Sequence, residues 1–144
     1  MIRLVPSAGI KKATNIDYEL LSFIIGRFIL PNKRVILNVH KTRGDYSYYC
    51  EDSKVIAIDL KSNDTFNEIV KTILHELRHY IQTKHFKIEF TDYTCYRTYY
   101  NCPEEKDARN FEKLSTEVCH IYKSYVKLLQ KIKDLNLDEF YSLS

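Results

Sequence analysis

The sequence predicts an α+β fold in which a small, mainly antiparallel sheet packs against helices. Two observations support this prediction. Segments with apolar residues at helical spacing flank shorter segments in which apolar residues alternate or run together, and a long loop separates the last two helical segments. A chain of 144 residues with a hydrophobic fraction of 44% is the usual size of one packed domain, so we expect a single domain over residues 1–144.

The first half of the chain is expected to hold one helix and three strands. Apolar residues recur at helical spacing over residues 15–30, and a proline follows them. Strands are expected at 34–40 and 45–50, joined by a turn at 41–44. A third strand is expected at 55–60, where the residues are almost continuously apolar.

The second half is expected to hold two helices joined by a loop. A capping box formed by Thr65 and Glu68 opens a helix over about 65–86. The final helix is expected over about 104–133, directly after Pro103, because proline suits the first turn of a helix.

The helix expected at 65–86 carries His75-Glu76-Leu77-Arg78-His79, which reads HExxH. Residues four apart share a helix face, so His75 and His79 can direct two imidazole nitrogens at one Zn²⁺ ion, with Glu76 placed to take a proton from metal-bound water. On a helical wheel the two histidines face away from the apolar side, which argues against histidines buried in the core. Chance would give roughly 0.01 such patterns in a chain of this composition.

A catalytic zinc ion usually takes three protein ligands, and two candidates compete for the third. Glu105 stands at the start of the final helix. His85 follows His79 by six residues, the spacing of HExxHxxGxxH, but Gln82 replaces the glycine that turns the chain in that motif. On a continuing helix His85 would lie about 80° off and about 9 Å further along the axis, so Glu105 is favoured while His85 stays open.

At these residues the chain resembles the zincin superfamily of metallopeptidases, and more narrowly its small gluzincin-like members, which include phage, plasmid and ImmA-type regulators. The resemblance covers about residues 55–112. It rests on the HExxH pentapeptide and on Glu105-Lys106-Asp107-Ala108, which is similar to the short element that carries the third ligand. The pentapeptide is specific to the superfamily, and the second element is less so.

This resemblance implies a minimal zincin-like domain and a Zn²⁺ cofactor bound by His75, His79 and Glu105. It implies a zinc metalloendopeptidase that hydrolyses a peptide or protein substrate, with Glu76 as the catalytic base. It also implies that the strand at 55–60 is the sheet edge that binds an extended peptide. The alternative is that this strand is interior, where its apolar residues also fit.

Further residues could serve this chemistry. A donor is needed for the oxyanion, and four tyrosines of the loop are candidates: Tyr93, Tyr96, Tyr99 and Tyr100. Asp107 could hydrogen-bond a ligand imidazole, or could simply be a solvated residue of the first helical turn.

Other classes of protein remain open. One alternative is a zinc-binding module of zincin fold that acts as a regulator or host-interaction protein without catalysis, although the intact Glu76 argues against it. Another is a structural helical domain with a coincidental HExxH. A weaker resemblance to the SprT-like proteases covers 75–86, but the later HGxxW-like element that carries their third ligand is missing, so DNA binding is not expected.

Composition limits the partners and the compartment. The net charge of +3 is modest, and the excess of lysine and arginine lies in residues 1–60 without the clustered basic face that nucleic acid normally requires, so nucleic acid is an unlikely partner. We expect an intracellular, cytoplasmic protein that contacts no membrane, because the sequence shows neither a signal peptide nor the roughly 18 to 20 apolar residues that span a bilayer. The four cysteines are expected as free thiols, with a Cys95–Cys102 disulfide as the alternative.

Overall fold

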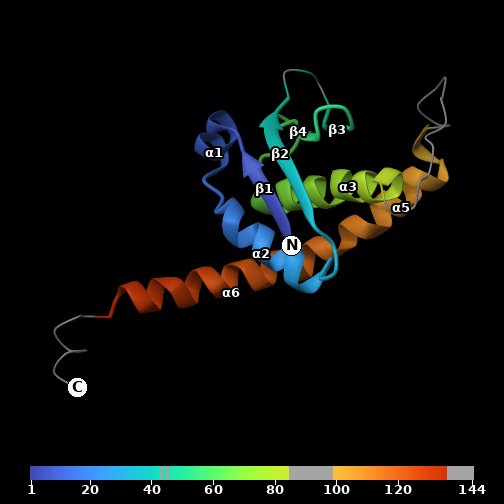
Figure 1. Cartoon of the computed structure of the whole chain (residues 1–144). Coiled ribbons are helices and arrows are strands. Elements are labelled where there is room, and N and C mark those ends of the chain that lie inside the picture. Colours follow the sequence, from blue (N-terminus) through green and yellow to red (C-terminus); the bar gives the residue numbers. More distant parts are fainter. Residues whose placement is uncertain (43, 45, 85–98, 136–144) are drawn as a thin grey trace.

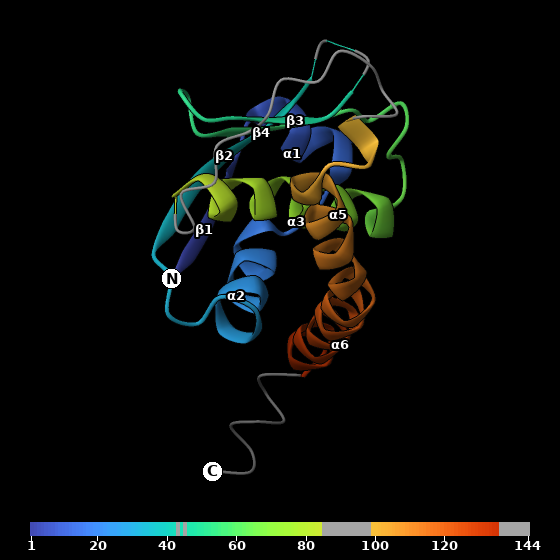
Figure 2. The same cartoon turned by 90° about the vertical axis from the view of Figure 1, so that its right-hand side faces the viewer.

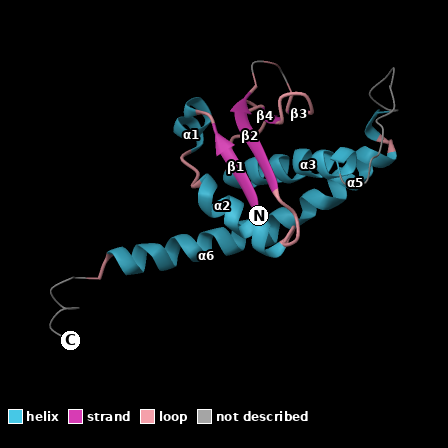
Figure 3. Cartoon of the chain, viewed as in Figure 1, coloured by secondary structure: helices cyan, strands magenta, loops and turns pink. Residues whose placement is uncertain are grey.

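The computed structural model describes residues 1–42, 44, 46–84 and 99–135, and it confirms an α+β fold. Helices gather beside a small sheet, and the last helix extends away from both (Figures 1 and 3). The elements of the first half are β1 (Ile2–Pro6), α1 (Ala8–Thr14), α2 (Tyr18–Phe28), β2 (Val35–Lys41), β3 (Tyr48–Cys50) and β4 (Val55–Ile58). Those of the second half are α3 (Phe66–Lys84), α5 (Pro103–Phe111), the 3₁₀ turn η1 (Glu112–Leu114) and α6 (Ser115–Lys133).

The four strands lie in the order β1-β2-β4-β3. The pairs β1–β2 and β2–β4 are parallel, and only β3–β4 is antiparallel, so the expectation of a mainly antiparallel sheet is wrong. Part of the error comes from β2, which pairs with β4 in parallel and not with β3, and part comes from β1, which the sequence analysis did not include. Two helices separate β1 from β2, and such a crossover returns the chain in the same direction and makes the pair parallel.

The expected turn at 41–44 does not join paired strands. Instead, residues 51–54 form the turn of a β3–β4 hairpin, with Tyr49 opposite Ile56. β4 is therefore interior, with β2 on one side and β3 on the other. The expectation that 55–60 forms the sheet edge is wrong, and the interior alternative is confirmed. The edge strands of the described sheet are β1 and β3.

The helix expected at 15–30 is present as the somewhat shorter α2, and a further helix that the sequence analysis did not include, α1, precedes it. Asn15 ends α1 in the left-handed conformation at φ 52°, which asparagine tolerates better than most residues. Asp17 then caps α2 by accepting a hydrogen bond from the Leu20 amide at 3.0 Å. These two caps separate α1 from α2.

The apolar face that the wheel assigned to α3 is confirmed. Its buried side chains pack against the sheet and α2: Ile69, Val70, Ile73, Leu74, Leu77 and Ile81. Thr65 caps the helix, because its Oγ1 accepts a hydrogen bond from the Glu68 amide at 3.2 Å. Strand residues alternate accordingly: Leu37 is buried on the helix side of β2, whereas Ile36 is about half exposed on the other side.

The helix expected at 104–133 is interrupted. The η1 turn separates α5, which packs against α3, from α6, which runs on past the body of the domain (Figure 2). The Glu112 amide at the end of α5 is shared between the carbonyls of Ala108 and Asn110, a tightening common at helix ends. Among the helices that the structure describes, none combines the length and apolar character that crossing a membrane requires.

Candidate metal centre

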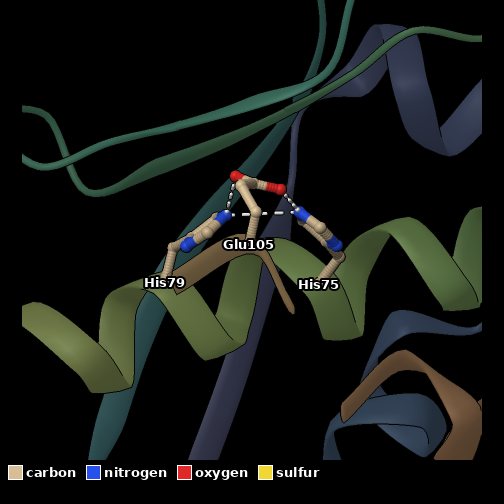
Figure 4. Close-up of side chains that lie close together, drawn as sticks. All are labelled: His75, His79 and Glu105. Carbon is tan, nitrogen blue, oxygen red and sulfur yellow. Dashed lines mark hydrogen bonds and ion pairs between the residues drawn. The ribbon is translucent and has the colours of Figure 1, made fainter. Parts of the chain in front are cut away.

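The two histidines of the pentapeptide project from neighbouring turns of α3, and their rings point toward the same spot (Figure 4). Their Nε2 atoms lie 3.2 Å apart. His79 is buried, with 8% of its residue surface exposed. His75 is partly exposed, with 16% of its side-chain surface accessible. The polar face of α3 predicted by the helical wheel is therefore present. It is partly buried, because α5 packs against it.

Glu105 completes the cluster from the first turn of α5. Its Oε2 lies 3.0 Å from His75 Nε2, and its Oε1 lies 2.8 Å from His79 Nε2 (Figure 4). Ligand atoms of these three residues all lie within 4.8 Å of one another. Glu105, the favoured third candidate, therefore lies with both histidines. The other candidate, His85, lies outside the described residues.

The donor set fits a zinc ion. Two imidazoles and one carboxylate are a usual catalytic ligand set, with metal bonds of about 2.0 to 2.2 Å. Tetrahedral geometry with such bonds spaces the donor atoms about 3.3 Å apart. The observed spacings between Glu105, His75 and His79 are 2.8 to 3.2 Å, so a small displacement of each side chain would open the cluster around an ion.

The outer nitrogen of His79 is fixed as a donor by Gln82. The Gln82 amide nitrogen donates to the Glu104 carbonyl at 2.9 Å and to Asp107 Oδ2 at 2.8 Å, and both are acceptors. This leaves the Gln82 oxygen facing His79 Nδ1 at 2.9 Å, so Nδ1 must carry the proton. In the neutral imidazole, Nε2 then presents a lone pair to Glu105.

The outer nitrogen of His75 is fixed in the same sense by a carboxylate. Its Nδ1 lies 2.9 Å from Glu112 Oε2, which accepts the Nδ1 proton. Neutral His75 therefore also directs an Nε2 lone pair at Glu105. Three groups with lone pairs converge on one point, and only a cation or additional protons can relieve their repulsion. Convergent lone pairs of this kind are the chemistry of a metal site.

The pKa shifts of the three residues also favour positive charge at this site: those of the two histidines are raised, and that of Glu105 is lowered. Burial alone would lower the pKa of His75, but the hydrogen bonds with Glu105 and Glu112 outweigh it and raise the pKa to about 10. The pKa of His79 is raised in the same way, mainly by Glu105 against the effect of burial. Burial acts to raise the pKa of Glu105, yet the hydrogen bonds from His75, His79 and Tyr99 hold it well below its usual range.

Glu76 is buried beside the cluster, and its own surroundings differ from those of Glu105. Burial raises the pKa of Glu76, while the charges of His75 and His79 oppose that rise. The backbone amide of Tyr49, on the edge strand β3, donates a hydrogen bond to the Glu76 carboxylate. The free edge of β3 therefore faces the candidate base.

Glu76 lines two cavities that meet at the Tyr46–Ser47 segment. One cavity, of about 200 Å³, includes His79 and Tyr99 in its lining. The other, of about 380 Å³, lies on the His75 side and is lined mainly by polar residues. A substrate placed along β3 would thus have room on both sides of Glu76.

The tyrosine candidates separate. Tyr99 hydrogen-bonds Glu105, and burial followed by that contact raises its pKa. Tyr100 lies elsewhere: its ring stacks under the Arg109 guanidinium at 3.7 Å, and its carbonyl accepts a hydrogen bond from Arg109. Tyr93 and Tyr96 lie outside the described residues.

Asp107 does not hydrogen-bond a ligand imidazole, so that expectation is wrong. It accepts hydrogen bonds from Arg78 Nε at 2.7 Å and from Gln82, and through Gln82 it supports the orientation of His79. The sequence analysis missed both Gln82 and Glu112 as partners of the ligands. Gln82 shares the polar face of α3 with His79, and Glu112 follows Glu105 by two helical turns, which is the signal that could have indicated them.

Residues 44–129 match the family described as "Protein of unknown function (DUF3920)". The matched segment includes His75, Glu76, His79 and Glu105, together with Gln82 and Glu112 that support the histidines. Searches of curated proteins and of solved structures gave no match.

Proposed function

The chain belongs to the DUF3920 family, and we propose that it is a zinc-dependent metallopeptidase that hydrolyses a peptide or protein substrate. One observation carries this proposal: the lone pairs of His75, His79 and Glu105 converge beside a buried Glu76. A structural zinc site does not need a buried carboxylate next to its ligands, whereas peptide hydrolysis needs a base there.

In this proposal His75, His79 and Glu105 hold the zinc ion. When bound, zinc supplies Lewis-acid chemistry, because it lowers the pKa of a bound water and polarises the scissile carbonyl. Glu112 and Gln82 orient the two imidazoles before metal binding. The histidine side chains therefore lose little conformational entropy when the ion binds.

Glu76 acts as the general base. Its carboxylate accepts the proton of the attacking water and then delivers it to the leaving amine. The Tyr49 amide holds the carboxylate in place, and burial raises the pKa of Glu76, which is the direction that suits a general base. Of the four tyrosine candidates, we propose Tyr99 as the donor to the developing oxyanion, because its hydroxyl already bonds Glu105.

The substrate would lie along β3 in an extended conformation. β3 is an edge strand whose free side faces Glu76, and an open edge offers backbone hydrogen bonds to a peptide regardless of its sequence. The cavities on both sides of Glu76 would accept the side chains that flank the scissile bond.

The test combines zinc content with peptide hydrolysis. Wild type purified without chelator should contain one zinc per chain and should cleave fluorescein-labelled, unfolded casein. Glu76→Gln should keep the zinc and lose hydrolysis by about 10²- to 10⁴-fold, which is the usual contribution of general acid–base catalysis. The chelated protein should regain activity when zinc is restored.

Two results would contradict the proposal. Casein cleavage by Glu76→Gln at the wild-type rate would remove the assigned base. Stoichiometric zinc without hydrolysis of casein or of a mixed peptide library would favour the non-catalytic zinc-binding module.

A further inference from the structure

A second concave surface lies beside the candidate metal centre. It is a groove of about 750 Å³ between α3 and the segment formed by α5 and η1. Four of the residues that line it are cationic: Lys71, Lys106, Arg109 and Lys113. The net charge of the whole chain is only +3, so this concentration of positive charge is local.

Three of these cations come from one face of the α5–η1 segment. Lys106, Arg109 and Lys113 recur at intervals of three and four residues, so they share one side of a helical segment. Lys71 reaches the groove from α3, one helical turn before His75. The buried residues of α5 lie on its other side: Glu104, Glu105 and Ala108.

The two anionic residues that line the groove are already engaged by groups around the metal centre. Asp107 accepts two hydrogen bonds from Arg78, at 2.7 and 3.3 Å, and one from Gln82 at 2.8 Å. Glu112 accepts a hydrogen bond from His75 Nδ1 at 2.9 Å. Their carboxylates therefore offer little counter-charge to the lysines of the groove.

The cations of the groove are weakly paired. Lys106 and Lys113 are exposed, and neither forms an ion pair with any residue that the structure describes. Lys71 lies 4.0 Å from Glu68, and both side chains are more than 40% exposed, so this pair contributes little. Arg109 contacts a neutral tyrosine, which does not cancel its charge. A concave surface lined by one sign of charge attracts ligands of the other sign.

The groove is continuous with the candidate active site. Lys71 and Glu112 line both the groove and the 380 Å³ cavity that contains His75 and Glu76. Lys71 precedes Glu76 by five residues, which is about 8 Å along a helix axis and about the span of two or three extended residues. A polypeptide that passes Glu76 on the His75 side can therefore reach the groove with its next few residues.

We propose that this groove binds an acidic segment of a polypeptide. The inference rests on the proposed function in one respect: the segment belongs to the peptide substrate and lies about two to five residues from the scissile bond. Lys106 and Lys113 are about 10 Å apart along the helix axis, so the groove has the length of about three extended residues.

Other anionic partners fit the groove less well. None of the described residues that line it is aromatic, whereas surfaces that bind single-stranded nucleic acid usually stack bases on aromatic rings. Its concave shape does not match the plane of a lipid headgroup surface. Carboxylates on an extended chain match both the charge and the length of the groove.

Fluorescence anisotropy with the full chain carrying Glu76→Gln tests this inference, because this variant should bind a peptide and cleave it only slowly. The probes are two fluorescein-labelled peptides that differ only at a few consecutive central positions, which hold Asp in one and Asn in the other. The Asp peptide should bind at least about tenfold more tightly, because several exposed ion pairs each add a little. Its affinity should fall as salt is added.

Charge reversal in the groove provides the matched comparison. In the same background, Lys106→Glu/Lys113→Glu should weaken binding of the Asp peptide at least about tenfold, because two attractions become repulsions. The control Lys127→Glu/Lys131→Glu makes the same change of charge on α6 and should keep the affinity within about threefold. All four lysines are exposed, so circular dichroism should show unchanged folding in both variants.

Three results would overturn the inference. The Asp and Asn peptides could bind equally well. Binding of the Asp peptide could survive Lys106→Glu/Lys113→Glu, or could fall equally in the α6 control. Tighter binding of a single-stranded oligothymidylate than of the Asp peptide would assign the groove to nucleic acid.

Digestion of a mixed peptide library by the protein with Glu76 intact tests the place of the acidic segment. Cleaved peptides should be enriched in Asp and Glu about two to five positions from the cleaved bond, and Lys106→Glu/Lys113→Glu should remove that enrichment. Cleavage without enrichment would overturn the assignment to the substrate and leave the peptidase proposal standing. Absence of all cleavage would contradict the peptidase proposal, and the anisotropy result would still decide whether the groove binds acidic peptide.

Discussion

The two imidazoles of the candidate metal centre are held by opposite means. His75 Nδ1 donates a hydrogen bond to the carboxylate of Glu112, whose side chain is 24% exposed at the end of α5. His79 Nδ1 donates a hydrogen bond to the side-chain oxygen of Gln82, a neutral and fully buried amide. The amide nitrogen of Gln82 in turn donates to the Glu104 carbonyl and to Asp107. Charge orients one ligand, and buried hydrogen bonds orient the other.

This difference makes it possible to change zinc affinity and the free energy of unfolding separately. A charged, partly hydrated partner increases the electron density on its imidazole, and its removal should affect metal binding more than folding. A buried, fully bonded partner is part of the packing between α3 and α5, and its removal should affect both. Substitutions on the two sides should therefore leave different patterns of zinc affinity and unfolding free energy.

The largest effect is expected at Glu105, which serves both sides. Glu105→Ala removes a direct ligand, so zinc affinity should fall by more than the roughly 100-fold that loss of an outer partner can cost. Competition with a fluorescent zinc chelator measures this change. His85→Ala is the control and should keep wild-type zinc affinity. If His85→Ala loses zinc affinity while Glu105→Ala keeps it, His85 is the third ligand.

The second effect is expected at Gln82. Gln82→Leu removes the three hydrogen bonds that Gln82 makes with His79, the Glu104 carbonyl and Asp107, and a hydrogen bond contributes about 0.5 to 1.5 kcal/mol net. We expect a loss of about 2 kcal/mol in the unfolding free energy of the metal-free protein and a 10- to 100-fold loss of zinc affinity. Urea unfolding in excess chelator and zinc competition measure the two. Unchanged unfolding would show that Gln82 is not part of the α3–α5 packing.

A smaller effect is expected on the opposite side, at Glu112. Glu112→Gln removes the charge and keeps an oxygen that can accept the His75 Nδ1 proton, which makes the support of His75 resemble that of His79. Zinc affinity should fall about tenfold, the lower end for an outer partner, while the unfolding free energy of the metal-free protein changes by less than about 1 kcal/mol. A loss of stability as large as that of Gln82→Leu would erase the distinction between the two sides.

The same contrast explains what could be predicted from the sequence. The spacing of His75 and His79 and the apolar face of α3 are local helical periodicities, so the sequence determines them directly. Glu105 needed only that α5 pack beside α3, and a resemblance supplied that arrangement. The orientation of Gln82 depends on acceptors 22 and 25 residues away, which no local pattern encodes.

The sheet was predicted less well for a related reason. The strands β2, β3 and β4 were expected near their true positions, but strand order depends on which neighbours pair across the fold. β1 is short and amphipathic, and its role as a parallel edge strand becomes visible only once α1 and α2 are seen to carry the chain back to β2. Periodicity indicates strands, whereas pairing is a property of the whole domain.

The smallest effect is expected at the outer end of the His79 support, at Arg78. The Arg78 guanidinium bonds both oxygens of Asp107, at 2.7 and 3.3 Å, and lies 5.1 Å from the centre of the Phe111 ring. Arg78→Lys keeps the charge and loses the two-point contact. Asp107 is 41% exposed at its side chain, so water can replace part of the lost bonding, and we expect less than about 1 kcal/mol in unfolding free energy. Zinc affinity should stay within about threefold of wild type, because Gln82 remains locked by the Glu104 carbonyl. A tenfold loss in zinc competition would instead mean that the orientation of His79 depends on charge after all, carried from Arg78 through Asp107, and the two imidazoles would then be held by the same means.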